Sequence, residues 1–372
     1  MKILHLLYES KGDYFGIGGV GTRAYEIYRY LRDRHEITLL CKKYPGARDG
    51  EKEGLSHLFM GTESKNLTKT FLAYACRSAQ FVRKHGSNFD IIIEEFSPAI
   101  PSFLHFFTEK PLVLQVQGYT GMLYFKKYNL AYAVALSLLE HLRPGFYKNF
   151  IFINSETRSK LSLGRPKHHE IIPNGVPAEL LASLDRPSPQ SRYVLFLGRI
   201  DIYGKGLDTL LRGYAEFYRS FPEVRLVIAG DGRDMELFKA MLVKLPEKVT
   251  RNIELLGWVS GDRKTDTLKN ASFAVFPSRH EVQPIAVLEA MAAWKPVIVS
   301  DIPEFSFVTE KGAGISFRTG DALSLAQSMK DLMNSRENQD MGQRGRGLVK
   351  DFTWESIAMR FEDFLYRVSG DK

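Results

Sequence analysis

Short apolar runs alternate along the chain with segments in which apolar residues recur every three or four positions. The runs Ile3–Leu7, Leu112–Val116 and Phe150–Ile153 predict buried strands. The segments Ala99–Phe107 and Asn129–Leu142 have helical spacing and predict helices between strands. Strand and helix keep alternating through this half of the chain, which predicts a parallel sheet covered by helices on both faces.

A polar stretch with two prolines, Asp185–Ser191, interrupts the alternation and predicts a linker. The alternation begins again at Tyr193–Leu197 and continues to Pro296–Val299. Near the end, Trp354–Val368 predicts an amphipathic helix with Ile357, Phe361, Phe364 and Leu365 on one side. The pattern therefore predicts two similar α/β domains followed by one long helix.

The length of 372 residues exceeds what a single core usually supports, which agrees with two domains. Apolar and charged contents of 44% and 25% are typical of a globular protein. Two cysteines, Cys41 and Cys76, form no disulfide framework and indicate a reducing compartment. The first strand is too short for a signal peptide, and Leu130–Leu139 is too short to span a membrane. We therefore expect a cytoplasmic protein.

The net charge of +8 is shared unevenly, with +6 in residues 1–185 and +2 in residues 186–372. Such an excess favours anionic partners. No zinc-finger spacing, aromatic RNA-binding string or long basic run is present, so nucleic acid is not expected as a partner. The segment Tyr119–Tyr128 mixes aromatics with lysines, a composition suited to an anionic membrane surface. An acceptor-site loop and helix start is an alternative for this segment that the sequence supports at least as well.

The stretch Ser278–Ser300 predicts a loop and a helix between two buried strands. Pro284 suits the first helical position, and the free amides of Ile285 and Ala286 at the helix start suit an anion such as phosphate. Two acids accompany this site, Glu281 in the loop and Glu289 within the helix. At this spacing Glu289 can bind sugar hydroxyls without crowding a phosphate, but two solvated surface acids would look the same.

A second candidate anion site is the loop Gly198–Gly206, which follows one strand and precedes a helix. In doubly wound sheets, ligands bind beyond the carboxyl ends of the strands. Arg199 offers a planar fork of donors and Lys205 a compact charge, so the two can clamp a diphosphate. Taken alone, the loop is as well explained as an ordinary basic surface.

The glycine-rich loop Gly16–Gly21 fits the dinucleotide-binding pattern and makes an NAD(P)-dependent oxidoreductase the rival in another reaction class. About eight residues separate it from the first strand, too many for the tight dinucleotide turn. The position about 20 residues further on is Cys41 rather than an acid. A module that binds a nucleotide sugar without transferring it is the non-enzyme alternative.

Six short motifs follow one another in a fixed order across nearly the whole chain. They are Gly18–Gly21, Ile172–Val176, Gly198–Arg199 with Lys205–Gly206, Ala229–Gly232, Leu256–Trp258, and the two glutamates followed by Ala290–Ala292. Each motif is weak, but the series resembles the retaining glycosyltransferases of family 4. The resemblance implies the GT-B fold, in which two Rossmann-like domains with parallel sheets face each other across an interdomain cleft.

The resemblance also implies roles for the two parts of the chain. Residues 1–185 would form the acceptor-binding domain, and the helix at about 354–372 would pack back on it. Residues 190–353 would form the donor-binding domain, with Arg199 and Lys205 on the diphosphate, Glu289 on the ribose and Glu281 at the donor sugar. The further positions implied for the donor are Gly18, Gly19, Gln283, Pro284, Ile285 and Ala286, and Gly21 would lie on the acceptor side.

Two departures from the family pattern concern the sugar. Many relatives have Glu-Gly-Phe-Gly where this chain has Glu281-Val-Gln-Pro284, so one amide is lost from the anion site and Gln283 is the candidate replacement. Many relatives have a histidine where Gln117 stands, which replaces a sugar-contacting imidazole with a neutral amide. The identity of the donor sugar therefore stays open.

The function implied by the resemblance is transfer of a hexose, with retention at the anomeric carbon, from a UDP- or GDP-linked sugar. The acceptor would be a saccharide or a lipid-linked saccharide in glycan or cell-surface polysaccharide biosynthesis. Neither a metal nor another cofactor is expected. A cytoplasmic position is expected, with a peripheral position at the inner face of the membrane as the alternative.

Overall fold

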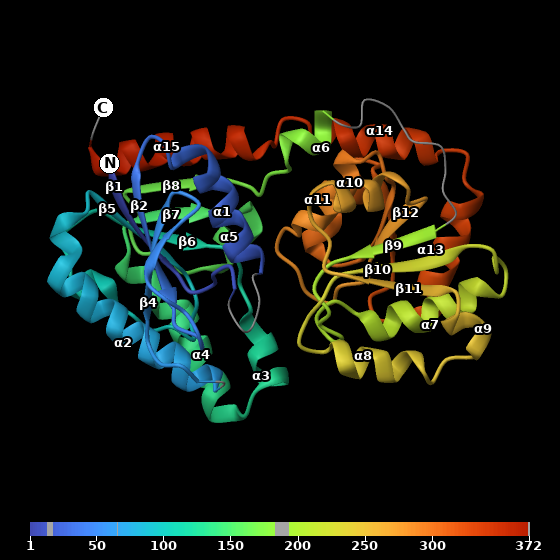
Figure 1. Cartoon of the computed structure of the whole chain (residues 1–372), viewed down its shortest axis with the longest axis horizontal. Helices are drawn as coiled ribbons and strands as arrows, with labels where there is room; N and C mark the ends of the chain where they lie inside the picture. Colours follow the sequence, from blue (N-terminus) through green and yellow to red (C-terminus); the bar gives the residue numbers. More distant parts are fainter. Residues whose placement is uncertain (13–17, 65, 183–192, 371–372) are drawn as a thin grey trace. The chain divides into compact units, whose positions relative to one another are not determined.

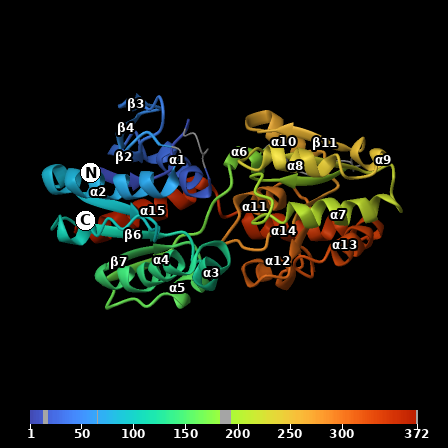
Figure 2. The same ribbon diagram turned by 90° about the horizontal axis from the view of Figure 1, so that it is seen from below.

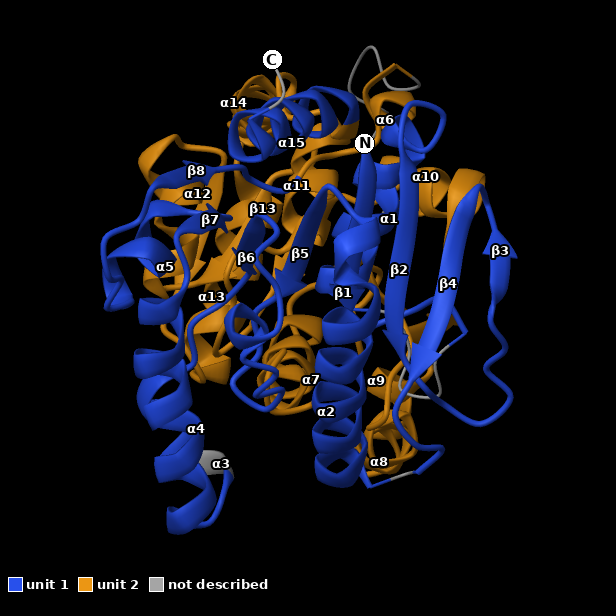
Figure 3. Ribbon diagram, turned by 90° about the vertical axis from the view of Figure 1, so that its left-hand side faces the viewer, with its two compact units in different colours: residues 1–174, 355–372 blue, residues 175–354 orange. Residues whose placement is uncertain are grey.

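The computed structural model describes residues 1–12, 18–64, 66–182 and 193–370, which divide into two compact units. Unit 1 consists of Met1–Asn174 and Glu355–Lys372, and unit 2 of Gly175–Trp354 (Figures 1 and 3). Unit 2 begins before the linker proposed from the sequence, because Val176 pairs with Thr353. The linker Asp185–Ser191 itself lies outside the described residues.

Unit 1 is built on an eight-stranded sheet with the order β3-β4-β2-β1-β5-β6-β7-β8. Neighbouring strands are parallel except for the antiparallel pair β3 and β4. The strands are β1 (Lys2–Leu7), β2 (Glu36–Lys42), β3 (Gly50–Lys52), β4 (Leu55–Met60), β5 (Ile91–Glu95), β6 (Leu112–Val116), β7 (Asn149–Phe152) and β8 (His168–Ile171).

Helices cover both faces of this sheet, as the nearly continuous apolar strands require. Leu4, Leu6 and Leu40 pack against α2, whereas Tyr28 of α1 contacts Phe361 of α15. The helices of unit 1 are α1 (Gly19–Leu31), α2 (Leu67–His85), α3 (Tyr124–Lys127), α4 (Leu130–Leu142), α5 (Ser155–Lys160) and α15 (Trp354–Ser369).

The prediction of a helix at Ala99–Phe107 is wrong. Only a three-residue 3-10 turn, Leu104–Phe106, forms within this segment. Pro101 lacks an amide hydrogen and disfavours helical backbone at the residue before it, and Phe103 adopts a φ of 46°. The apolar residues of this segment have helical spacing, but its backbone cannot adopt an α-helix.

Unit 2 is built on a six-stranded, wholly parallel sheet with the order β11-β10-β9-β12-β13-β14. This is the doubly wound order in which the chain reverses direction across the sheet between the first and fourth strands, here β9 and β12. The strands are β9 (Tyr193–Leu197), β10 (Arg225–Ala229), β11 (Ile253–Gly257), β12 (Phe273–Phe276), β13 (Val297–Ser300) and β14 (Gly314–Phe317).

Successive residues of these strands point to opposite faces and join two separate cores. Val194 and Phe196 pack on the side of α7 and α13, whereas Leu195 and Leu197 pack on the side of α11. Helix α7 lies beside α13, and α11 beside α14 (Figures 1 and 2). The helices of unit 2 are α6 (Ala178–Ala182), α7 (Leu207–Tyr218), α8 (Met235–Leu242), α9 (Glu247–Thr250), α10 (Gly261–Lys269), α11 (Ile285–Ala292), α12 (Ser306–Glu310), α13 (Ala322–Asn334) and α14 (Asn338–Val349).

Candidate functional site

The point between β9 and β12 where the strand order reverses is the place where doubly wound sheets bind ligands. The loop after β9, residues 198–206, and the loop after β12, residues 277–284, both start at the carboxyl end of the sheet. These are the two loops that sequence analysis singled out. The sheet topology of unit 2 therefore places them at one edge.

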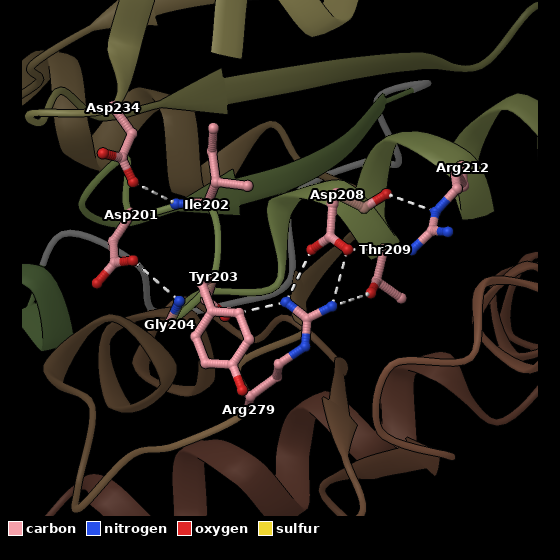
Figure 4. A network of polar contacts seen from close by, with 9 residues as sticks. All are labelled: Asp201, Ile202, Tyr203, Gly204, Asp208, Thr209, Arg212, Asp234 and Arg279. Atoms are coloured by element: carbon pink, nitrogen blue, oxygen red, sulfur yellow. Dashed lines mark hydrogen bonds and ion pairs between the residues drawn. The ribbon is translucent and has the colours of Figure 1, made fainter. Parts of the chain in front are cut away.

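Side-chain carboxylates shape the loop after β9. The Gly204 amide donates to Asp201 Oδ1 at 2.9 Å, and the Ile202 amide donates to Asp234 Oδ2 at 3.0 Å (Figure 4). Because Asp234 follows β10, the second contact joins this loop to the neighbouring strand end. The loop thus has a defined backbone path before any ligand binds.

Arg279 joins the loop after β12 to the start of α7. Its guanidinium donates to both carboxylate oxygens of Asp208 at 2.8 Å and to the Tyr203 carbonyl at 3.0 Å (Figure 4). Burial alone would raise the pKa of Asp208, but the hydrogen bonds and charge of Arg279 lower it below its usual value. Sequence analysis gave Arg279 no role, because a single basic residue in a polar loop offers no signal of such a clamp.

A glycine is required where the two loops touch. Gly206 adopts a φ of 63°, and a Cβ atom at this position would overlap the Pro277 carbonyl oxygen. Only a residue without a side chain permits both the conformation and the contact. The Lys205–Gly206 pair recognised in the sequence therefore has a structural reason for its glycine.

The structure brings together two of the three residues proposed as catalytic. Lys205 Nζ forms an ion pair with Glu281 Oε1, and Ser278 Oγ donates to the same oxygen at 2.8 Å. Both charged side chains are only partly exposed. The loop after β9 and the loop after β12 therefore meet at this pair of opposite charges.

Arg199, the third residue proposed as catalytic, lies exposed on the loop after β9. Its guanidinium has no hydrogen-bond or ion-pair partner among the residues that the structure describes. Arg199 and Lys205 thus share one loop, but only Lys205 is held by an acid. The fork of Arg199 is available to an anion.

Helix α11 begins one residue later than predicted. Pro284 occupies the N-cap, with an extended ψ of 120°, rather than the first helical position. The Val287 amide donates to the Pro284 carbonyl at 3.1 Å, while the amides of Ile285 and Ala286 have no partner within the described part of the chain. Both residues are partly exposed, so two amides at the positive end of the helix dipole can receive an anion.

Glu289, proposed for the ribose, lies one turn further along α11 and is almost fully buried. Its Oε1 accepts a bond from Lys264 Nζ of α10 at 2.5 Å. Gln283 and Pro284 lie in the turn before the helix, next to the free amides. The proposed donor residues of unit 2 thus come from the loop after β9, the loop after β12 and α11.

The glycine loop of unit 1 is occupied by the chain's own carboxylate. Glu9 Oε2 accepts bonds from the amides of Gly18 and Gly21, each at 2.8 Å, at the start of α1. Gly16 lies outside the described residues, and Gly19 is the first residue of α1. An oxidoreductase would need these amides for a pyrophosphate, so the Glu9 contact argues against that alternative.

Gln117 belongs to a buried polar network at the carboxyl ends of β5 and β6. Its Nε2 donates to both oxygens of Glu95 at 2.9 Å. Gln115 Nε2 donates to Glu95 Oε1 at 2.5 Å, and His5 Nε2 lies 3.2 Å from the same oxygen. An acid at the end of an apolar strand was the signal for Glu95, and sequence analysis did not use it.

Arg23 explains the Ile172–Val176 motif. Its buried guanidinium donates to the carbonyls of Ile172 and Pro173 at 2.8 and 2.7 Å and to Asn174 Oδ1 at 3.1 Å. Burial, opposed by the charge of Glu95, lowers the pKa of Arg23 to about 10. Asn174 therefore helps to hold the end of the first segment of unit 1.

Two family models match the chain in succession. Glycosyltransferase Family 4 matches residues 17–180, and Glycosyl transferases group 1 matches residues 191–335. No helix among the described residues has both the length and the apolar character needed to cross a membrane.

Curated relatives resemble the chain over part of its length. Phosphatidyl-myo-inositol mannosyltransferase of Mycobacterium leprae is 32% identical over 193 residues, which is 50% of each chain. Glycogen synthase of Mycobacterium tuberculosis is 26% identical over 193 residues, 50% of this chain and 46% of the relative. The chain thus spans about half the length of the curated relatives it matches.

Solved structures share the fold over the full length. Sucrose-phosphate synthase of Thermosynechococcus elongatus matches with a TM-score of 0.79 at 17% identity. The match covers 100% of both chains. HepE of Anabaena in complex with UDP has a TM-score of 0.72 at 16% identity, covering 99% of this chain and 100% of that one. With a family 4 model on the first part of the chain and a group 1 model on the second, the chain belongs to these glycosyltransferases and has the GT-B fold.

Proposed function

We propose that the protein is a retaining glycosyltransferase that moves a hexose from a nucleoside-diphosphate sugar to a saccharide or lipid-linked acceptor. In this proposal unit 2 binds the donor and unit 1 the acceptor, and the transfer needs no metal. Two of the similar proteins suggest which donors to try first. HepE binds UDP and UDP-glucose, and the mycobacterial relative is a mannosyltransferase.

The observation that carries the proposal is the set of anion-binding groups around the sheet reversal in unit 2. Arg199 has no partner among the described residues, the amides of Ile285 and Ala286 are free within the same range, and Lys205 is paired with Glu281. Diphosphate oxygens match the planar fork, the ammonium and the helix start together. At Gly206 the loop after β9 contacts the Pro277 carbonyl of the loop after β12. An ordinary charged surface loop would not require such a close contact.

The chemistry follows from where charge develops. As the bond between the anomeric carbon and the diphosphate oxygen breaks, the acceptor hydroxyl oxygen bonds to the same carbon and its proton passes to the leaving diphosphate. In the transition state negative charge grows on the leaving phosphate and the sugar becomes oxocarbenium-like. Arg199, Lys205 and the α11 amides would stabilise the phosphate charge. Glu281, which faces Lys205, would stabilise positive charge at the sugar.

The Lys205–Glu281 pair gives the free protein a stable arrangement of two partly buried charges. A bound diphosphate would compete with Glu281 for Lys205 Nζ, so the carboxylate would turn toward the sugar as the donor binds. Ser278 Oγ, which donates to Glu281 at 2.8 Å, would stay bonded to the carboxylate while it turns. Donor binding would thus set the position of the acid.

The test begins with a thermal-shift panel of UDP-glucose, GDP-mannose and ADP-glucose. A donor at 100 times its Kd stabilises the protein by about 2.7 kcal/mol. Turnover on the identified donor should then fall by about 10²–10³ in Arg199→Ala and in Lys205→Ala, since each removes one preorganised donor group. Glu281→Gln should lower turnover more than binding, whereas Glu289→Ala should weaken binding of the nucleoside diphosphate.

Arg251→Ala is the matched control, because Arg251 is an exposed arginine of unit 2 paired with Glu247 on α9. It should bind and turn over the donor as the wild type does. The proposal fails if no nucleotide sugar shifts the unfolding temperature, or if Arg199→Ala and Lys205→Ala both retain full turnover. A non-catalytic binding module would show the thermal shift without any transfer.

A further inference from the structure

Helix α4 of unit 1 exposes an apolar face. Leu130, Val134, Leu138 and Leu142 recur every four residues, and their exposed fractions lie between 41% and 72%. The opposite side of the helix packs through Ala133 and Leu136 against Tyr124 and Ala99. One side of α4 therefore contributes to the core, and the four residues form a row that unit 1 leaves uncovered.

No charged side chain interrupts this row. Glu140, the one acid of α4, is buried and accepts bonds from the amides of Thr120 and Gly121 at 2.8 Å and from Tyr124 Oη at 3.0 Å. The acid thus ties the preceding segment, which sequence analysis singled out for a membrane surface, to the inner side of the helix. The outer side stays free of negative charge.

Aromatic rings extend the row beyond the end of α4. Phe146 and Phe106 are both exposed, and the ring of His105 stacks on Phe146 with centroids 4.8 Å apart. Large contiguous patches of exposed apolar side chains are rare on soluble proteins, and such patches mark binding surfaces. We call Leu130, Val134, Leu138, Leu142, Phe106 and Phe146 the α4 face.

A basic cluster adjoins the end of the α4 face that carries Phe146. Lys148, Arg165 and Lys167 are exposed, and none forms an ion pair with a described residue. The Lys167 amide donates to the Lys148 carbonyl at 2.7 Å, and a Cβ atom at Gly164 would lie 2.8 Å from the Gly145 carbonyl oxygen. The two loops that carry the three cations therefore touch.

We propose that the α4 face and its basic cluster dock on an anionic membrane surface. An apolar helix face enters the boundary between headgroups and acyl chains, and adjacent cations bind anionic headgroups. The three unpaired cations beside the face favour a negatively charged partner, and a lipid bilayer with anionic headgroups supplies negative charge over its whole area. This inference does not depend on the proposed transferase activity, because it concerns residues of unit 1, whereas the proposed donor groups belong to unit 2.

The test is flotation of the full chain with two kinds of vesicle, phosphatidylcholine alone and phosphatidylcholine mixed with phosphatidylglycerol. The wild type should float with the mixed vesicles at low salt. Leu130→Glu/Leu138→Glu should lower binding by at least about tenfold, because two acids enter the apolar boundary. Lys148→Gln and Lys167→Gln should each lower binding about fivefold and weaken its dependence on salt.

Leu237→Glu/Leu323→Glu is the matched control, since both leucines are exposed on helices of unit 2. It should float as the wild type does, and every variant should keep the wild-type circular dichroism spectrum. Failure of the wild type to float at low salt overturns the proposal, as does unchanged flotation of the α4 variant. Light scattering that finds a dimer which the α4 variant dissociates, without flotation, would assign the face to a second copy instead.

The nucleotide thermal shift separates this proposal from the transferase proposal. The α4 variant should retain the shift, because its substitutions lie in unit 1. Loss of flotation with a retained shift supports docking alone. A missing shift with intact flotation would refute donor binding and leave the docking proposal standing.

Discussion

Lys295, between α11 and β13, is a cation buried without an ion-pair partner among the described residues. Only 5% of the residue is exposed, and burial lowers the pKa of its ammonium to about 8. In the unfolded chain the same group titrates at its ordinary value of 10.5. Below pH 8 the folded state therefore has to keep a buried charge, which reduces the stability of the protein.

We expect Lys295→Met to stabilise the protein at pH 7 by up to about 3 kcal/mol, the free energy that corresponds to this pKa shift. The unfolded wild type binds more protons than the folded wild type between pH 8 and 10.5, so wild-type stability rises with pH in that window. The advantage of the variant should shrink accordingly. Urea denaturation of both proteins at pH 7 and pH 10 measures the difference.

Lys248→Met is the control, because Lys248 is exposed on α9. It should give no comparable gain at pH 7 and no comparable change between the two pH values. An equal gain from both substitutions would mean that removal of a positive charge from the protein, rather than burial of Lys295, is responsible.

The sequence was sufficient to propose residues for the donor site. It did not show which of these residues contact one another. Arg199, Lys205, Glu281 and the amides of Ile285 and Ala286 stand out because they follow strands or begin a helix. The Lys205–Glu281 ion pair depends on contacts between loops 76 residues apart. Glu9, whose carboxylate occupies the glycine loop of unit 1, lies in a polar stretch that looks like any other loop.

At the scale of helices and strands, the apolar pattern located many, but not all, of the elements that are buried on one or both faces. Strand β6 (Leu112–Val116) and helix α4 agree with their predicted positions to within one residue. Strands β3, β4, β8 and β14 and helices α13 and α14 were not predicted. In β4 and β8 a mixture of polar and apolar residues gives a weak signal. The Ala99–Phe107 prediction failed because spacing alone ignores the backbone restrictions of proline.

The Arg279–Asp208 contact joins the loop after β12 to the start of α7, and its contribution to stability should be measurable. We expect Arg279→Ala to lower the free energy of unfolding of unit 2 by about 1–2 kcal/mol, because it removes hydrogen bonds to a charged, partly buried carboxylate. Arg212 pairs with the same Asp208 at 3.0 Å but is mostly exposed. Arg212→Ala should therefore cost less than about 0.5 kcal/mol.

Denaturation in urea, followed by tryptophan fluorescence, compares these two variants. Trp258 and Trp294 lie within unit 2, and Trp354 is its last residue as well as the first residue of α15, so most of the signal reports the unit that carries the contact. Equal losses in both variants would show that the fork geometry of Arg279 adds nothing to an ordinary surface ion pair.

At the scale of the whole molecule, unit 2 is an insertion into unit 1. The chain leaves unit 1 after Asn174 and returns at Glu355. The two crossings are bonded to each other, since the Val176 amide donates to the Phe352 carbonyl at 2.7 Å and the Trp354 amide to the Val176 carbonyl at 3.0 Å. Sequence alternation predicts two α/β domains, but it does not show that the crossings pair.

The final helix, α15, returns to unit 1 and completes its core. Phe361 is fully buried, and its ring meets Tyr28 edge to face with centroids 6.1 Å apart. His35 Nε2 of unit 1 also lies 2.5 Å from Glu362 Oε1. Unit 1 therefore depends on a segment that is synthesised only after the whole of unit 2.

Phe361→Ala should destabilise unit 1 by about 3–5 kcal/mol through the cavity it leaves, and should leave unit 2 nearly unchanged. Thermal unfolding followed by circular dichroism detects both units, whereas tryptophan fluorescence reports mainly unit 2, through Trp258 and Trp294. The variant should therefore unfold earlier by circular dichroism and at the wild-type temperature by fluorescence. Met359→Ala, on the exposed side of the same helix, should change neither transition. If both signals fall together in Phe361→Ala, the two units unfold as one cooperative body and the assignment of α15 to a separately stable unit is wrong.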